Sequence, residues 1–166
     1  EKADQEKLWS FETGEGNASS IVATTDTVYV AGNKILYAIN TTTGTERWRT
    51  SHDSHGIGPR AVDDGVLCVD GWFEVLAFEA SSGSQQWEFA PGRSVGKPVL
   101  SNGVAYITHT STGEYEPEEY RLYALEQQSG SPLWSYQSDI PMTSPAVYDG
   151  TVFVGDKDGH LKAVSS

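Results

Sequence analysis

One eleven-residue pattern recurs three times and constrains the fold more than any other feature of the sequence. It consists of an alanine, a glycine six positions later and a tryptophan four positions after the glycine. The pattern occurs as AINTTTGTERW (38–48), AFEASSGSQQW (77–87) and ALEQQSGSPLW (124–134). A pattern repeated at this spacing is typical of an architecture built from similar structural units that pack side by side.

The tryptophans mark four units, which start near Trp9, Trp48, Trp87 and Trp134. About twenty residues after each tryptophan comes a short apolar triplet with strand character: 28–30, 67–69, 105–107 and 152–154. Three triplets follow a turn dipeptide typical of hairpins, namely Asp64-Gly65, Asn102-Gly103 and Asp149-Gly150. We therefore expect a hairpin at the centre of each unit.

Two further strands complete each unit. A proline opens a short apolar piece before three of the triplets, at Pro59, Pro98 and Pro145, as proline does at the first residue of a strand. An apolar run follows every triplet, at 36–39, 75–78, 122–125 and 161–164. Since no segment shows a sustained helical period, the sequence predicts an all-β fold of four antiparallel four-stranded units within a single module, 1–166.

The third unit is longer than the others because it contains an insertion, THTSTGEYEPEEYR (108–121), between its second and third strands. Insertions in repeat proteins lie on one rim of the array, where they either bind partners or form tolerated surface loops. The candidate contact residues of this loop are Tyr115, Glu116, Glu118, Glu119 and Tyr120.

The charge balance excludes two classes of partner. Eleven Lys and Arg against 23 Asp and Glu give a net charge of −12, so nucleic acid and anionic membranes are poor partners. The acidic residues are dispersed, which is typical of a folded acidic surface and would suit a halophilic source. No apolar run is long enough for a transmembrane helix, so we expect no direct membrane insertion.

The sequence gives little support for a reactive cysteine or for a metal site. Cys68 is the only cysteine, in the apolar stretch VLCV, where it can be a buried small residue or a reactive thiol. We favour the buried residue. The groups His52, Asp53, His55 and Asp156, Asp158, His160 offer metal-ligand types, but neither has the spacing of a regular metal site. Asn17 and Asn40 begin sequons whose glycosylation the sequence leaves open.

The repeated pattern resembles the tryptophan-docking motif, A-x-D-x-x-T-G-x-x-x-W, of the pyrroloquinoline quinone (PQQ)-like β-propeller repeat family. This resemblance covers the whole chain and implies a propeller whose four-stranded sheets are its blades. A fourth copy would be split between Ala163 and Trp9. The resemblance assigns a structural, blade-docking role to these positions: Trp9, Ala38, Gly44, Trp48, Ala77, Gly83, Trp87, Ala124, Gly130, Trp134 and Ala163.

The family contains two functional branches. PQQ-dependent alcohol and sugar dehydrogenases hold the quinone and calcium in the central channel beside a vicinal cysteine pair, which Cys68 cannot form. The other branch includes the propeller lipoprotein of the bacterial outer-membrane assembly machine. We therefore expect a non-catalytic scaffold without a cofactor, exported or at the cell surface, with protein or peptide partners on its blade rims. The alternative is a fragment of a PQQ-dependent dehydrogenase whose catalytic residues lie elsewhere.

The number of blades leaves three assemblies open. Propellers with this motif usually have eight blades, whereas this sequence contains four units. The chain can close alone into four blades, pair with a second copy in an eight-bladed homodimer, or form part of a longer propeller. We favour the homodimer, because an open array would expose unpaired strand edges.

Overall fold

The computed structural model describes residues 6–14, 18, 20–32, 34–53, 56–92, 94–113 and 116–166, without the side chains of 112, 113, 116 and 117. This part of the chain forms strands and turns but no helix. The strands are β1 (Ile21–Ala23), β2 (Thr27–Gly32), β3 (Ile35–Asn40), β4 (Glu46–Ser51), β5 (Gly58–Asp63), β6 (Val66–Asp70), β7 (Val75–Glu79), β8 (Gln85–Phe89), β9 (Val99–Ser101), β10 (Val104–Gly113), β11 (Glu116–Glu126), β12 (Pro132–Ser138), β13 (Ala146–Tyr148), β14 (Thr151–Gly155) and β15 (Leu161–Ser165).

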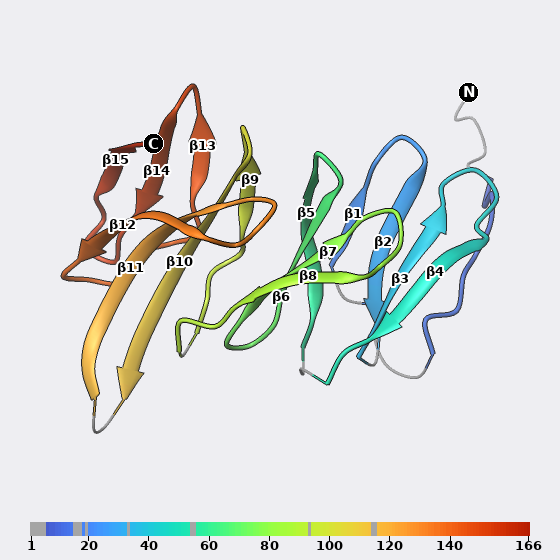
Figure 1. The fold of residues 1–166 in the computed structure, drawn as a ribbon, viewed down its shortest axis with the longest axis horizontal. Helices are drawn as coiled ribbons and strands as arrows, with labels where there is room; N and C mark the ends of the chain where they lie inside the picture. Colours follow the sequence, from blue (N-terminus) through green and yellow to red (C-terminus); the bar gives the residue numbers. More distant parts are fainter. Residues whose placement is uncertain are drawn as a thin grey trace.

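The strands form four antiparallel sheets in chain order. The first sheet is β1-β2-β3-β4, the second β5-β6-β7-β8, the third β9-β10-β11-β12 and the fourth β13-β14-β15. They stand in a row, with the first sheet on the right of Figure 1 and the fourth on the left. The opening strands β1, β5, β9 and β13 lie beside one another along the row, so they form its inner edge. The all-β fold predicted from the repeats is confirmed.

The predicted hairpin turns are confirmed. Asp64 and Gly65 both have positive φ angles, 40° and 77°, and the turns at 102–103 and 149–150 have the same conformation. A turn with two positive φ angles matches the twist of the strands that flank it, which explains the preference for Asp-Gly and Asn-Gly. In the first sheet, a looser turn at 24–26 replaces this dipeptide, with the amide of Thr24 donating to the carbonyl of Thr27 at 2.8 Å.

The fourth sheet corrects one expectation, that the Trp9 segment could complete it within the same chain. β15 pairs with β14 alone, so the sheet has three strands. Residues 6–14 form no strand and pack instead on the first sheet, at the opposite end of the row, where Trp9 and Phe11 contact a cluster formed by Val30, Tyr37 and Ile39. The row of sheets is consequently open in a single chain.

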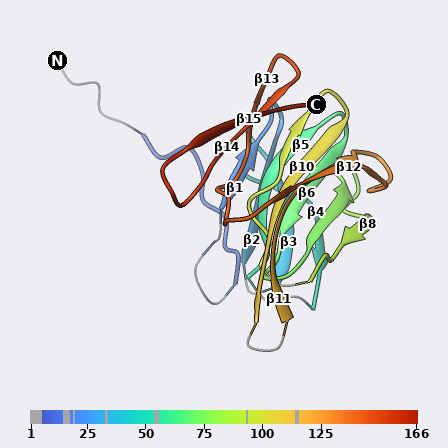
Figure 2. The same ribbon diagram turned by 90° about the vertical axis from the view of Figure 1, so that its left-hand side faces the viewer.

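The insertion of the third unit is built into the sheet. β10 has ten residues and β11 eleven, and they stay paired from Val104↔Glu126 to Gly113↔Glu116. The two strands therefore extend beyond their neighbours as a long hairpin, which both views show (Figures 1 and 2). Threonine and tyrosine favour extended backbone, which is why the inserted residues lengthen two strands and do not form an irregular loop.

Separate apolar clusters fill the spaces between consecutive sheets. Leu36 and Ala38 of the first sheet pack against Leu76 and Phe78 of the second. Corresponding clusters lie between the second and third sheets and between the third and fourth. Because inner strands contribute side chains to both faces, β6 is buried along its whole length. The sheets are thus the packing layers, and each junction repeats the geometry of the one before it.

Candidate functional site

Trp48, Trp87 and Trp134 lie at the junctions between consecutive sheets, and Trp9 lies on the first sheet at the end of the row. Each of three indole N–H groups donates a hydrogen bond to a backbone carbonyl of the following sheet. The pairs are Trp9 to Thr41 at 2.9 Å, Trp48 to Ala80 at 3.0 Å and Trp87 to Gln127 at 2.9 Å. Every acceptor lies three residues before a repeated glycine. The structure therefore brings each tryptophan onto the repeat copy of the next sheet.

The repeated glycines have two physical reasons to be glycine. Gly44, Gly83 and Gly130 have φ angles of 69°, 74° and 70°, in the left-handed region that other residues adopt at a cost. A Cβ atom on each would also lie 2.6–2.7 Å from an indole carbon of Trp9, Trp48 or Trp87, respectively. The glycine of one sheet and the tryptophan of the preceding one therefore fit each other.

The repeated alanines lie opposite tryptophans within their own sheets. The register pairs Ala38 with Trp48, Ala77 with Trp87 and Ala124 with Trp134. The three alanines are fully buried, whereas Ala163, at the same position of the fourth sheet, is exposed. The tryptophan predicted to face Ala163 is Trp9, which lies on the first sheet. The docking role of all these residues remains a prediction, and their contacts are consistent with it.

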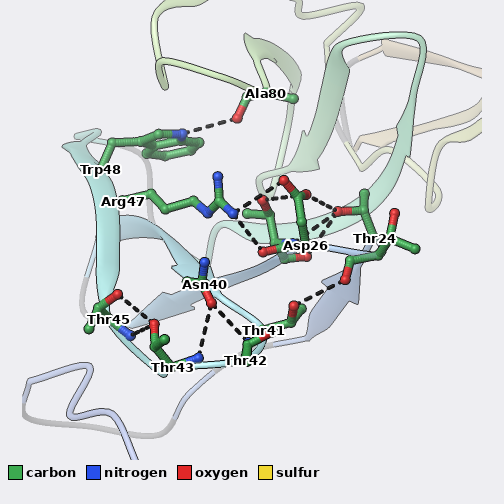
Figure 3. A network of polar contacts seen from close by, with 12 residues as sticks. Thr24, Asp26, Asn40, Thr41, Thr42, Thr43, Thr45, Arg47, Trp48 and Ala80 are labelled. Atoms are coloured by element: carbon green, nitrogen blue, oxygen red, sulfur yellow. Dashed lines mark hydrogen bonds and ion pairs between the residues drawn. The ribbon is translucent and has the colours of Figure 1, made fainter.

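A polar network supports the loop that carries the repeat (Figure 3). The Asn40 side-chain oxygen accepts the amides of Thr42 and Thr43 at 2.9 and 3.0 Å. Arg47, beside Trp48, forms an ion pair with Asp26 at 3.2 Å. These contacts fix the loop and the turn at 24–26 relative to each other, at the edge of a groove.

This groove, of about 510 Å³, lies where the first and second sheets meet. We call it the junction groove. Its charged lining consists of Asp26, Arg47, Asp63, Asp64 and Glu79, and its remaining lining is Thr24, Thr27, Tyr29, Trp48, Val62, Gly65, Ala80 and Ser81. Four carboxylates face one guanidinium, and that guanidinium is already paired with Asp26. The groove therefore has an excess of negative charge and presents a potential suited to a cationic group.

The next junction shows why this one is open. There, Gln127 and Gln128 occupy the positions that Ala80 and Ser81 occupy in the second sheet. The Gln127 side-chain amide donates to the carbonyl of Asp63 at 2.7 Å, and that of Gln128 donates to the carbonyl of Asp64 at 3.1 Å. Ala80 and Ser81 are too short to reach across in this way. Hence the lengths of these two side chains decide whether the loop is bridged to the turn of the preceding sheet.

The insertion residues are only partly presented to solvent. Tyr115 lies outside the described residues, and the side chain of Glu116 is not described. Tyr120 is buried, and its hydroxyl donates to Glu118 at 2.8 Å. Glu119 pairs with Arg121, whose guanidinium lowers the pKa of the Glu119 carboxyl. Glu118 is thus the most exposed of the described candidate contact residues.

The candidate metal ligands are in separate surroundings. His55 lies outside the described residues, while the ring of His52 packs against Phe78. Asp156 accepts the amides of Asp158 and His160 at 3.0 and 2.9 Å, an arrangement that shapes the predicted turn before β15. No group of three or more His, Cys, Asp or Glu side chains in the described part of the chain is placed to hold a metal ion.

Cys68 is fully buried in β6, which confirms its interpretation as a core residue. Burial raises the pKa of its thiol to about 12, so the reactive thiolate is scarce at neutral pH. The described residues also contain no helix with the length and apolar character needed to cross a membrane.

Comparison with known proteins places the repeats in a family. The PQQ-type family described as outer membrane protein assembly factor BamB matches residues 1–90 and 32–166. The chain belongs to this family. BamB of Moranella endobia (strain PCIT) is 28% identical over 98% of this chain, and BamB of Burkholderia pseudomallei (strain K96243) is 30% identical over 92%. The BamB-type chain spans 47% and 39% of the length of these two relatives.

Solved structures agree with the fold. The computationally designed Ika4 protein superimposes with a TM-score of 0.79 at 14% identity, over 97% of this chain and 98% of its own. BamB from Moraxella catarrhalis gives a TM-score of 0.62 at 19% identity, over 84% of this chain and 43% of its own. A europium-containing methanol dehydrogenase gives 0.62 at 17% identity, over 78% and 26%. The sheets of this BamB-type chain are therefore those of a β-propeller, here in an open row.

Proposed function

We propose that the chain is a non-catalytic scaffold in an exported compartment or at the cell surface, and that a protein partner inserts a basic side chain into the junction groove. Its relatives in Moranella endobia and Burkholderia pseudomallei are outer membrane protein assembly factors, which supports protein binding as the activity. The observation that carries the proposal is the open groove between the first two sheets, whose counterpart between the second and third is closed by Gln127 and Gln128.

The chemistry of the closed junction indicates what the open one can bind. In the closed junction, side-chain N–H donors reach backbone carbonyls of the turn at 63–65. A lysine or arginine side chain also offers N–H donors at the end of a long flexible stem. Its charge would be attracted by Asp63, Asp64 and Glu79, which outnumber the free cationic groups of the groove. A basic side chain thus matches both the length and the charge of the opening.

A labelled peptide rich in lysine and arginine tests this proposal, with an acidic peptide of equal length as the comparison. We expect the basic peptide to bind, and Asp64→Asn to weaken binding about two- to fivefold by removing one surface charge. Asparagine keeps the Asx-Gly turn at 64–65. Asp149→Asn is the matched control, because Asp149 occupies the same turn position in the fourth sheet, which does not line the groove. Equal effects of both variants would contradict the proposal.

A second substitution closes the groove without removing charge. Ser81→Gln introduces at the first junction the side chain that Gln128 supplies at the next one. Since Ser81 is exposed, the longer side chain can be accommodated at the surface. We expect this variant to retain the stability of the native chain and to lose peptide binding. Unchanged binding would show that the peptide binds elsewhere.

The second candidate function is part of a PQQ-dependent dehydrogenase, which the similarity of fold to the methanol dehydrogenase favours. The described residues do not fit a quinone and calcium site, because no three of their His, Cys, Asp or Glu side chains are placed to hold one metal ion, and Cys68 is buried without a neighbouring cysteine. We therefore propose that the chain binds neither PQQ nor calcium. Stoichiometric quinone binding in the presence of calcium, measured by absorption difference spectra, would favour this second function.

A further inference from the structure

One tryptophan lies outside the repeated pattern. Trp72 and its neighbour Phe73 lie in the turn between β6 and β7, whereas the residues between β2 and β3 are the polar pair Asn33-Lys34. The amide of Gly71 donates to the carbonyl of Glu74 at 2.9 Å, so Trp72 and Phe73 form the tip of a tight turn. Such tips favour Gly, Asn and Asp for their backbone conformation. The turn itself therefore does not require two aromatic residues.

Packing of the core does not require these two rings either. Trp72 is 64% exposed and Phe73 is 53% exposed, while Trp87 of the repeated pattern is only 8% exposed. Neither ring belongs to the apolar clusters that fill the junctions between the described sheets. Large apolar side chains that lie side by side at a surface are typical of interaction sites. We call residues 71–74 the aromatic turn.

The side chains of the aromatic turn are held by close contacts. A Cβ atom at Gly56 would collide with the indole nitrogen of Trp72, so the edge of the indole packs on the backbone of the connection between β4 and β5. The ring of Phe73 lies at right angles to the indole, at 88°, with 6.4 Å between the ring centroids. A Cβ atom at Gly71 would collide with the Glu74 carboxylate, which therefore lies at the base of the same turn.

From this arrangement we propose that the aromatic turn binds an arginine side chain of a protein partner. A guanidinium in the angle between the two perpendicular rings lies within about 6 Å of both centroids, the range of a cation–π interaction. Arginine also stacks on aromatic rings and pairs with carboxylates, and Glu74 supplies a carboxylate beside the rings. The net charge of −12 attracts a cationic partner to the chain as a whole.

The aromatic turn is separate from the junction groove. The turn at 63–65, which lines the groove, precedes β6, whereas the aromatic turn follows it. The two sites therefore lie at opposite ends of this five-residue strand. Trp48 lines the groove and Trp72 lies in the aromatic turn, so each site contains one indole that reports on it. Binding at either site can consequently be detected, or excluded, without reference to the other.

Nuclear magnetic resonance of the native chain tests the proposal. The probe is N-acetyl-arginine amide, and the comparison is N-acetyl-citrulline amide, which has nearly the same shape without the charge. Trp72→Phe identifies the indole N–H signal of Trp72. We expect the arginine probe to shift this signal saturably and the citrulline probe to bind about fivefold more weakly. Equal binding of the two probes would overturn the proposal, as would an arginine probe that shifts the Trp48 signal and not the Trp72 signal.

A substitution at Phe73 separates a cation–π site from a merely apolar one. Phe73→Leu keeps an apolar side chain but removes the aromatic face, so it should weaken binding of the arginine probe about two- to fivefold. Tyr148→Leu is the matched control, because Tyr148 is 78% exposed but lies on β13 of the fourth sheet. Unchanged indole signals of the four repeated tryptophans show that each variant is folded.

Two outcomes would overturn the proposal. Native affinity of Phe73→Leu for the arginine probe would mean that the aromatic face is not used. Binding of the native chain to phosphatidylcholine vesicles, with no response of the Trp72 signal to the arginine probe, would identify a lipid surface as the occupant of the aromatic turn.

Discussion

The indole N–H of Trp87 donates to the carbonyl oxygen of Gln127 at 2.9 Å, across the junction between the second and third sheets. This bond joins residues forty positions apart and is one of three equivalent bonds among the described residues. Trp87 is also the most buried of the repeated tryptophans. The pair therefore shows how the repeat can connect neighbouring sheets: one side chain packs on the glycine of the next sheet and bonds to its loop.

Removing this hydrogen bond should destabilise the chain. Trp87→Phe keeps an aromatic ring but leaves the Gln127 carbonyl without its donor, which costs about 1–3 kcal/mol of unfolding free energy. Trp134→Phe is the matched control, because the Trp134 indole N–H has no acceptor among the described residues, although its ring packs on Tyr106. Urea unfolding measures both. A loss for Trp134→Phe as large as for Trp87→Phe would show that the hydrogen bond is not the cause.

Close approach at a repeated glycine gives a second prediction. Gly83→Ala must adopt a φ of 74° and place a Cβ 2.6 Å from a Trp48 ring carbon. Gly159→Ala has nearly the same backbone strain, with a φ of 83°, but no atom lies within 4 Å of its new Cβ. We expect about 1–2 kcal/mol of strain in both variants and a further 1–3 kcal/mol of overpacking in Gly83→Ala only. Thermal unfolding would contradict this if the two variants melted together.

Gln127 should contribute to stability in a way that Gln128 does not. Gln127 is completely buried, and Gln127→Ala removes the amide that donates to the Asp63 carbonyl, for an expected cost of about 1–3 kcal/mol. Gln128 makes the corresponding bond from an exposed position, so Gln128→Ala should change the unfolding free energy by less than about 0.5 kcal/mol. Chemical denaturation of both variants provides the comparison, and similar losses would contradict it.

His109 should make stability depend on pH. Its ring is buried in β10, and neither of its nitrogens has a hydrogen-bond partner among the described residues. Burial lowers the pKa of His109, an effect that Arg121 reinforces and Glu119 opposes. As pH falls below about 6.5, the unfolded chain therefore binds a proton before the folded chain does, and stability decreases until the lowered folded pKa is passed.

The test for His109 compares unfolding midpoints at pH 7.5 and 5.5. The native chain should lose stability between these values, and His109→Phe, which cannot bind a proton, should lose less. The ring shape is roughly conserved in this substitution, so the variant should fold. If both proteins showed the same change, the loss would have to come from other groups.

The sequence determined the strands and their turns because these depend on neighbouring residues. Asp64-Gly65 specifies a tight hairpin through its own backbone preferences, and the apolar residues on either side of the turn need burial wherever they are placed. The repeated glycine likewise has a positive φ within its own loop. Local chemistry was sufficient for these features, so they were predicted from the sequence.

The contacts between units could not be predicted from the sequence and became visible only in the tertiary structure. The insertion became a longer hairpin, and Tyr120, predicted as a contact residue, is buried. The junction groove was not predicted, although the change from Gln127-Gln128 to Ala80-Ser81 was visible in aligned repeats. Whether a short side chain leaves a groove depends on its distance from the neighbouring sheet, which the sequence does not give.

The split copy of the repeat also separates what the sequence predicts from what the tertiary structure decides. From sequence alone, Trp9 and Ala163 were the two halves of one motif, and their pairing was defined by the other three copies. The tertiary structure decided that they do not meet within one chain, because the Trp9 segment packs on the first sheet and β15 lies at the far end of an open row. The preference of the alanine for a tryptophan partner is set by the local sequence and recurs in every copy of the motif. Whether the row of sheets closes into a ring depends instead on the rotation from each sheet to the next, summed over all four sheets.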